Sequence, residues 1–147
     1  SADGSLVRKM IYSRFWRLVF TMTGAPAFIA GANQLGYLNY APSAEEVNDY
    51  AASYSGRIGQ VTKWFKGYPN GCKDIDPHLN NIDIPVHILW GDQDAFLKAD
   101  NAERLHARLP NSSLTIFKDC GHFFYQDKCS DFTKLLQSWI NGGYKSD

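Results

Sequence analysis

Apolar residues follow two different patterns along this chain, and the change falls near residue 80. Up to that point they recur at the spacing of amphipathic helices, with no strand pattern among them. The predicted helices cover residues 5–20, a segment that starts at Ser43, and residues 57–67. Ser43 and Glu46 have the spacing of a capping box, and Gly67 is placed to end the third helix. A Gly/Ala/Pro-rich stretch (24–36) and a turn-rich stretch (68–81) complete this part.

The second part of the chain alternates short β-type runs with helical segments. The predicted strands cover residues 85–91 and 112–119, and the predicted helices cover 98–110 and 130–140. The last helix has its apolar residues, Ile140 included, on one face that we expect to be buried. Strands separated by a helix usually run parallel, so the order β-α-β-α predicts the end of a parallel α/β sheet. Two parallel strands do not form a stable open sheet, so either another chain adds strands or the predicted strands are too short.

Composition narrows the class of partner. The 147 residues are 44% hydrophobic, which suits one globular domain with a core. Lysine plus arginine and aspartate plus glutamate both number 15, so no nucleic-acid partner is predicted. No apolar run reaches the ~20 residues of a membrane span. Three widely spaced cysteines predict neither a disulfide framework nor a zinc site, and they favour a reducing, cytoplasmic compartment.

Two loops follow the predicted strands, and each carries a residue suited to proton transfer. GDQDAFL (91–97) contains Asp92 and Asp94, and DCGHFF (119–124) contains His122. Because ligands of open α/β sheets gather at the carboxyl ends of the strands, an acid and the imidazole can meet there. The acid would orient the imidazole, which would then take a proton from a nucleophile or from water. Taken singly, the aspartates also suit turn formation, and His122 suits a structural role in an aromatic loop.

Residues 82–140 resemble the C-terminal end of the α/β-hydrolase family. Members of that family show Trp-Gly-x-x-Asp at the end of one strand and Gly-His at the end of the next. Here the first motif is matched by Trp90, Gly91 and Asp94, and the second by Gly121-His122.

The resemblance implies a fold for the chain and a role for two residues. Asp94 would be the acid of a catalytic triad and His122 its general base. The implied fold is α/β, the C-terminal part of an α/β-hydrolase. In it a helical cap (1–80) precedes the β-α-β-α ending of a parallel sheet (81–147). No metal and no organic cofactor are implied.

The nucleophile of the resembled family has no counterpart in this sequence. That family carries it on a Gly-x-Ser-x-Gly elbow, with Asp or Cys in some members, and the pattern is absent from the 147 residues. We therefore expect proteolytic processing in the cap and a heterodimer, whose second polypeptide carries the N-terminal half of the fold and the nucleophile. A truncated chain is the alternative. Cys120 fits poorly as nucleophile because it shares a short loop with His122, and Ser1 would leave the Asp94–His122 pattern unexplained.

The reaction expected from the resemblance depends on the missing residue. A serine would give hydrolysis of an ester, an amide, a lactone or a carbon–carbon bond beside a carbonyl in a small-molecule substrate. An aspartate would give dehalogenase or epoxide hydrolase chemistry, and a non-enzymatic ligand-binding relative is a further possibility. Phe123, Phe124 and Trp64 are the predicted substrate contacts, although packing of the cap against the core would also account for such aromatic residues.

Overall fold

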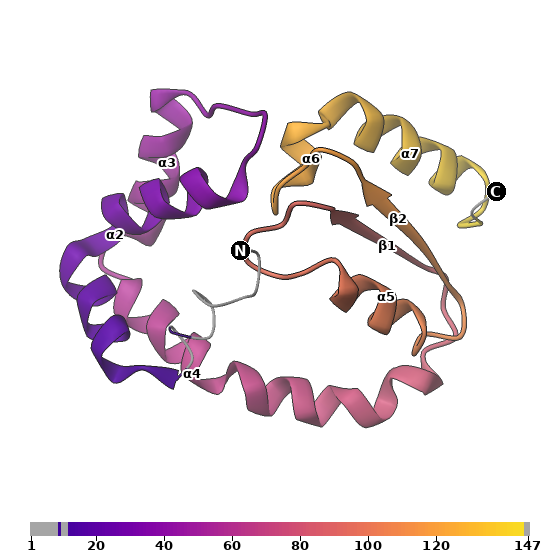
Figure 1. Cartoon of the computed structure of the whole chain (residues 1–147), viewed down its shortest axis with the longest axis horizontal. Helices are drawn as coiled ribbons and strands as arrows, with labels where there is room; N and C mark the ends of the chain where they lie inside the picture. The colour runs from indigo at the N-terminus through magenta and orange to yellow at the C-terminus, as the bar shows by residue number, and fades with distance from the viewer. Residues whose placement is uncertain (1–8, 10–11, 146–147) are drawn as a thin grey trace.

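The computed structural model describes residue 9 and residues 12–145, and it places a group of helices beside a small α/β unit (Figure 1). The helical group consists of α2 (Arg14–Gly36), α3 (Ala44–Tyr54) and α4 (Ile58–Ile75). α2 packs against both of the other helices, and a 3-10 helix, η1 (Asp76–Asn81), leads towards the sheet. The helix predicted over 5–20 lies partly outside the described residues, and α2 begins within that range after its N-cap, Ser13.

The Gly/Ala/Pro-rich stretch 24–36 is helical and belongs to α2. Gly24 interrupts the helix with a φ of 77°, a left-handed value that glycine adopts without a steric penalty. Pro26 follows in the first turn of the resumed helix, where a missing backbone N–H leaves no hydrogen bond unmade. Ala25 and Ile29 of this second half are buried, so the bend serves to bring an apolar face against the neighbouring helices.

The capping box predicted for α3 is confirmed. The Ser43 hydroxyl accepts the N–H of Glu46 at 3.2 Å, and the Glu46 carboxylate accepts the N–H of Ser43 at 2.7 Å. The end predicted for the third helix at Gly67 is wrong, because α4 continues to Ile75. The prediction of turns over 68–81 therefore fails for its first half. One glycine in a helix costs only about 1 kcal/mol, which the packing of α4 against α2 readily offsets.

The predicted β-α-β-α order is confirmed. Strand β1 (Val86–Gly91) pairs in parallel with β2 (Ser112–Phe117), and helix α5 (Asp100–His106) lies between them in sequence. Among the described residues these are the two strands of the sheet. Successive side chains of a strand point to opposite faces of the sheet, and Ile88 lies on the face towards α5. There it forms a buried cluster with Ala102 and Leu109.

The opposite face of the sheet is covered by α6 (Phe124–Asp127) and α7 (Cys129–Asn141), so that helices flank both sides of the strands (Figure 1). His87 of β1 contacts Trp139 of α7 on this side, with ring centroids 5.8 Å apart. The prediction that Ile140 lies on the buried face of the last helix is wrong, because Ile140 is 47% exposed at its end. Parallel strands with covered faces are typical of α/β proteins.

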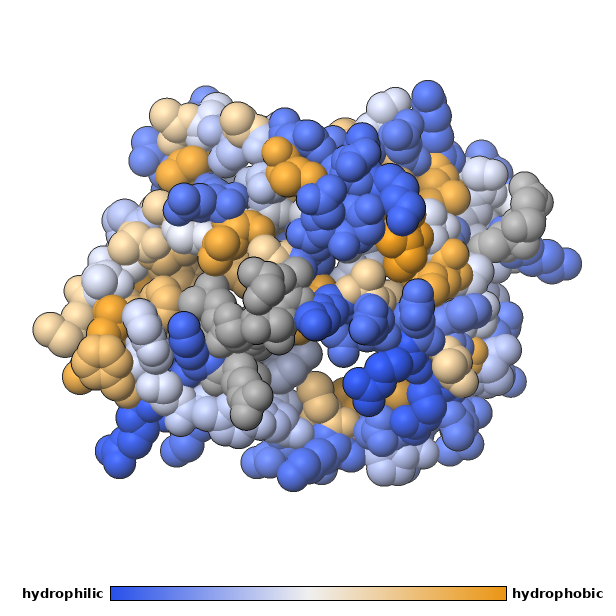
Figure 2. Space-filling model, viewed as in Figure 1, coloured by the Kyte–Doolittle hydropathy of each residue, from blue (hydrophilic) through white to orange (hydrophobic). Residues whose placement is uncertain are grey.

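The side of the molecule that Figure 2 presents carries both hydrophilic and hydrophobic side chains. Hydrophilic side chains cover much of that face, and hydrophobic ones are scattered between them (Figure 2). Within the described part of the chain, none of the helices has the length and apolar character that crossing a membrane requires.

Candidate active site

The loops that carry Asp94 and His122 start side by side. In the parallel register Gly91 is opposite Phe117, so both strands end at the same level of the sheet. The chain continues from each strand end into one of the two loops. Two residues that are 28 positions apart in sequence can therefore meet above the sheet.

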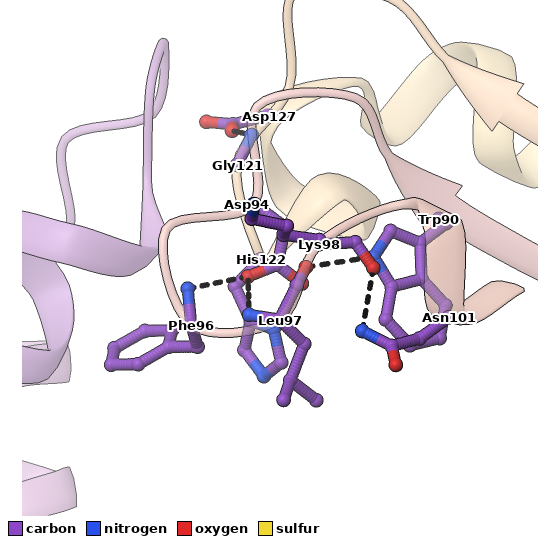
Figure 3. Close-up of polar contacts among 9 residues, drawn as sticks. All are labelled: Trp90, Asp94, Phe96, Leu97, Lys98, Asn101, Gly121, His122 and Asp127. Atoms are coloured by element: carbon purple, nitrogen blue, oxygen red, sulfur yellow. Dashed lines mark hydrogen bonds and ion pairs between the residues drawn. The ribbon is translucent and has the colours of Figure 1, made fainter. Parts of the chain in front are cut away.

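Asp94 is held in one orientation by its own loop. Its side chain is 3% exposed, and its Oδ1 accepts the backbone N–H groups of Phe96 at 2.7 Å and Leu97 at 2.9 Å (Figure 3). This is the turn-forming role that the sequence left open. The second oxygen, Oδ2, remains available for another donor. The two alternatives for this residue are therefore realised together, one on each oxygen.

His122 takes that second position. Its Nδ1 lies 2.7 Å from Oδ2 of Asp94, and its side chain is 35% exposed. Because a carboxylate can only accept, we assign the proton to Nδ1, which leaves the lone pair of Nε2 on the other side of the ring. The edges of Phe96 and Phe123 pack beside the imidazole, with centroids 5.0 and 5.3 Å from it. The ring is thus fixed by one hydrogen bond and two aromatic contacts.

Asp92, the other acid of the first loop, does not contact His122. Its carboxylate lies 3.4 Å from the backbone N–H of Cys120 and 3.7 Å from the ammonium of Lys118. These contacts tie the first loop to the second one below the histidine. Asp92 therefore supports the arrangement, while Asp94 alone of the two acids contacts the imidazole.

The remaining motif residues allow the loops to approach each other. The Trp90 indole N–H donates to the carbonyl of Leu97 at 3.2 Å and closes the loop that holds Asp94 (Figure 3). A Cβ on Gly91 would overlap the backbone of Cys120 and Gly121. These close approaches explain why tryptophan and glycine accompany the aspartate in the motif.

Asp127 is a residue of the site region whose role the sequence did not predict. Its carboxylate accepts four backbone N–H groups, from Leu38, Asn39, Tyr40 and Gly121, at 2.8–3.1 Å. Burial acts to raise the pKa of Asp127, but the four hydrogen bonds outweigh it and the pKa lies below its usual value. The signal in the sequence was an acid shortly after the Gly-His pair, yet three of its four partners are 87–89 residues away and no local pattern reveals them.

Of the predicted substrate contacts, Phe123 and Trp64 line one cavity together with His122. This cavity, of about 580 Å³, lies between the helical group and the two loops. Phe124 is not among its lining residues. It stacks on Phe117 with centroids 5.3 Å apart and contacts Phe132 of α7, on the far side of the loop.

Cys120 is fully buried beneath the histidine loop. Its thiol donates to the carbonyl of Lys118 at 3.2 Å, and burial raises its pKa to about 11. The reactive thiolate is therefore scarce at neutral pH. Across the residues that the structure describes, no cluster of three His, Cys, Asp or Glu side chains could hold a metal ion.

Comparison with known proteins adds three similarities. A family model described as alpha/beta hydrolase fold matches residues 5–128. A 2-hydroxy-6-oxononadienedioate/2-hydroxy-6-oxononatrienedioate hydrolase of Klebsiella pneumoniae is 32% identical over 83 residues, 56% of this chain and 29% of that protein. A 2-hydroxy-6-oxo-6-phenylhexa-2,4-dienoate hydrolase of Burkholderia cepacia is 28% identical over 75 residues, 51% of this chain and 26% of that protein.

A solved structure shows the same likeness in three dimensions. A serine hydrolase from the polyaromatic hydrocarbon-degrading bacterium Cycloclasticus zankles superposes with a TM-score of 0.66 at 18% identity. The match covers 88% of this chain and 49% of that structure. At this identity the likeness concerns the fold alone. The chain spans no more than about half the length of any of these proteins.

Proposed function

Because this chain belongs to the alpha/beta hydrolase family, we propose that Asp94 and His122 are the acid and the general base of a hydrolase. The predicted family and fold class are confirmed, and the roles of the two residues rest on one observation. That observation is the 2.7 Å contact between Nδ1 of His122 and Oδ2 of an aspartate whose other oxygen is already held by two backbone N–H groups.

The geometry supports a proton-transfer cycle at Nε2 of His122. With Nδ1–H donated to Asp94, Nε2 can take the proton of an attacking hydroxyl group. The imidazolium that forms is stabilised by the Asp94 carboxylate, and it then returns the proton to the leaving group. Water repeats the cycle and releases the product from the nucleophile. Asp94 accepts the Nδ1–H throughout and keeps the ring in the required tautomer.

We place the nucleophile in a segment outside these 147 residues, since they contain no nucleophile elbow. Our proposal keeps the arrangement expected from the sequence, in which a second polypeptide carries the N-terminal half of the fold. A serine on that segment would complete the triad. An aspartate in its place would leave His122 to activate water instead, so the identity of this residue decides the reaction class.

Carbon–carbon bond hydrolysis is the reaction that we propose for the whole protein. The substrates named for two relatives share a 2-hydroxy-6-oxo-dienoate framework with neither an ester nor an amide. A hydrolase can split such a molecule only at a carbon–carbon bond beside the ketone. The hydroxyl of water is then added to the carbonyl carbon and its hydrogen to the departing carbon. Phe123 and Trp64 would contact the substrate, and simple esters are the alternative substrate class.

The test uses the native protein that contains this sequence and follows loss of a 2-hydroxy-6-oxo-dienoate spectroscopically. His122→Ala and Asp94→Asn should each lower kcat by about 10²–10⁴-fold. His78→Ala and Asp74→Asn are the matched controls, because both residues are exposed, His78 on η1 and Asp74 on α4. Both controls should stay within about threefold of the wild type. Equal activity of the His122 variant and the wild type would overturn the proposal.

A further inference from the structure

The cavity beside His122 has an apolar and largely aromatic wall. Among its lining residues are Phe20, Phe28, Trp64, Phe65, Phe96 and Phe123. No lysine, arginine, aspartate or glutamate is among the described residues that line it. The polar side-chain groups among its described lining residues are the His122 imidazole, the Asn33 amide, the Trp64 indole N–H and tyrosine hydroxyls. A carboxylate placed here would give up its hydration without meeting a cationic side chain of this chain.

The tyrosines of the wall also indicate that a negative charge is unfavourable in this cavity. Burial raises the pKa of Tyr37, of Tyr68 and of Tyr125, which means that a negative charge is unfavourable at each of these positions. The Glu46 carboxylate, which accepts the hydroxyl of Tyr40, adds to the rise at Tyr37. An anionic group of a ligand would meet this same environment in the cavity.

We propose that the cavity takes an uncharged aryl or alkyl group of the substrate and rejects a carboxylate in that position. This inference rests on the proposed function, because the reacting carbonyl has to lie at His122, which lines the cavity beside Phe96 (Figure 3). The substrates of the two relatives differ at this distal group, which is a carboxylate-bearing chain in one and a phenyl ring in the other. The wall fits the second kind, although the first relative is the more similar in sequence.

The volume agrees with a group of that size. About 580 Å³ lies within the usual 300–1,000 Å³ of a small-molecule site and is ample for a phenyl or naphthyl group. Aromatic rings on the wall can meet such a group edge-on, the arrangement that aromatic pairs prefer. Phe96 and His122 already show it, with an interplanar angle of 70°.

The test compares two substrates that share the dienoate and differ in the distal group. With the native protein, kcat/KM for 2-hydroxy-6-oxo-6-phenylhexa-2,4-dienoate should exceed that for 2-hydroxy-6-oxononadienedioate by at least about 100-fold. Equal values, or a preference for the dienedioate, would overturn the inference and leave the proposed function standing.

If neither compound is hydrolysed, the proposed activity fails and binding decides the inference alone. The neutral fluorophore N-phenyl-1-naphthylamine serves as the reporter. It is displaced by 1,4-diacetylbenzene or by terephthalate, which have the same shape but differ by two charges. The diketone should displace the reporter at a concentration at least about tenfold lower. Equal potency, or stronger displacement by terephthalate, would overturn the inference.

A matched pair of variants shows whether the cavity is responsible. Trp64→Arg adds a cation to the wall, whereas Ile75→Arg adds one outside it on the same helix at nearly the same exposure, 58% against 59%. Trp64→Arg should reduce the preference for the neutral compound at least about tenfold, and Ile75→Arg should leave it unchanged. An equal effect of the two variants would locate the selectivity elsewhere and overturn the inference.

Discussion

Replacing Asp127 by alanine should loosen the connection between the end of α2 and the histidine loop. The carboxylate holds three consecutive backbone N–H groups, those of Leu38, Asn39 and Tyr40, and also that of Gly121, next to His122. Two segments that are remote in sequence are thereby joined through one side chain. The substitution removes all of these bonds and leaves the four donors without that acceptor.

The decrease in the free energy of unfolding depends on which of the four donors water can reach. The bonds to Leu38 and Asn39 are exposed, so water replaces much of what is lost there. The bonds to Tyr40 and Gly121 are partly buried, and each hydrogen bond to a charged acceptor contributes about 1.5–3 kcal/mol. The free energy of unfolding should therefore fall by about 3–6 kcal/mol, out of about 5–15 kcal/mol for a whole domain.

Urea denaturation followed by tryptophan fluorescence measures this loss. Asp131→Ala is the control, because Asp131 is an exposed acid in the first turn of α7 and its removal should cost about 0.3–1 kcal/mol. Asp127→Asn keeps one acceptor oxygen and should fall between the two variants. Faster hydrogen exchange at the amides of Tyr40 and Gly121 should accompany the loss. If Asp127→Ala costs no more than Asp131→Ala, the reasoning about this carboxylate is refuted.

Two further predictions concern positions that pack closely. Gly121→Ala should lower the thermal midpoint of unfolding and disturb the histidine loop, because the new Cβ would overlap the backbone oxygen of Gly36. An unchanged midpoint together with unchanged His122 NMR signals would contradict this prediction. Burial lowers the pKa of His87 in the folded state. As the pH falls through the ordinary histidine pKa, the unfolded chain therefore takes up the proton first, and the free energy of unfolding decreases. Urea unfolding at pH 7.5 and 5.5 should show a larger loss for the wild type than for His87→Gln, and equal losses would refute the argument.

The acid and the histidine could be predicted because their signals are local. Each stands in a short loop directly after an apolar strand, and parallel strands bring such loops to the same edge of a sheet. The sequence could not separate turn formation from histidine binding at Asp94, since one oxygen serves each purpose. The Asp127 contacts lay beyond prediction because they join residues that no periodicity relates.

The helical part was less predictable because tertiary packing overrides local preference there. Gly67 and Pro69 read as helix breakers, yet α4 passes through both and packs on α2. The sequence also could not predict which way the Phe124 side chain points. A short helix starts at that residue, so adjacent phenylalanines diverge, with Phe123 at the cavity and Phe124 stacked on Phe117.

The most direct test of the central claim is to find the nucleophile that His122 serves. The native protein would be labelled with a fluorophosphonate and its mass measured under native and denaturing conditions. We predict the label on a serine outside these 147 residues, on a second polypeptide that accompanies this one in the native sample and separates on denaturation. Hydrolytic activity from this 147-residue chain alone, or a label on one of its own residues, would contradict the proposed role of a second polypeptide.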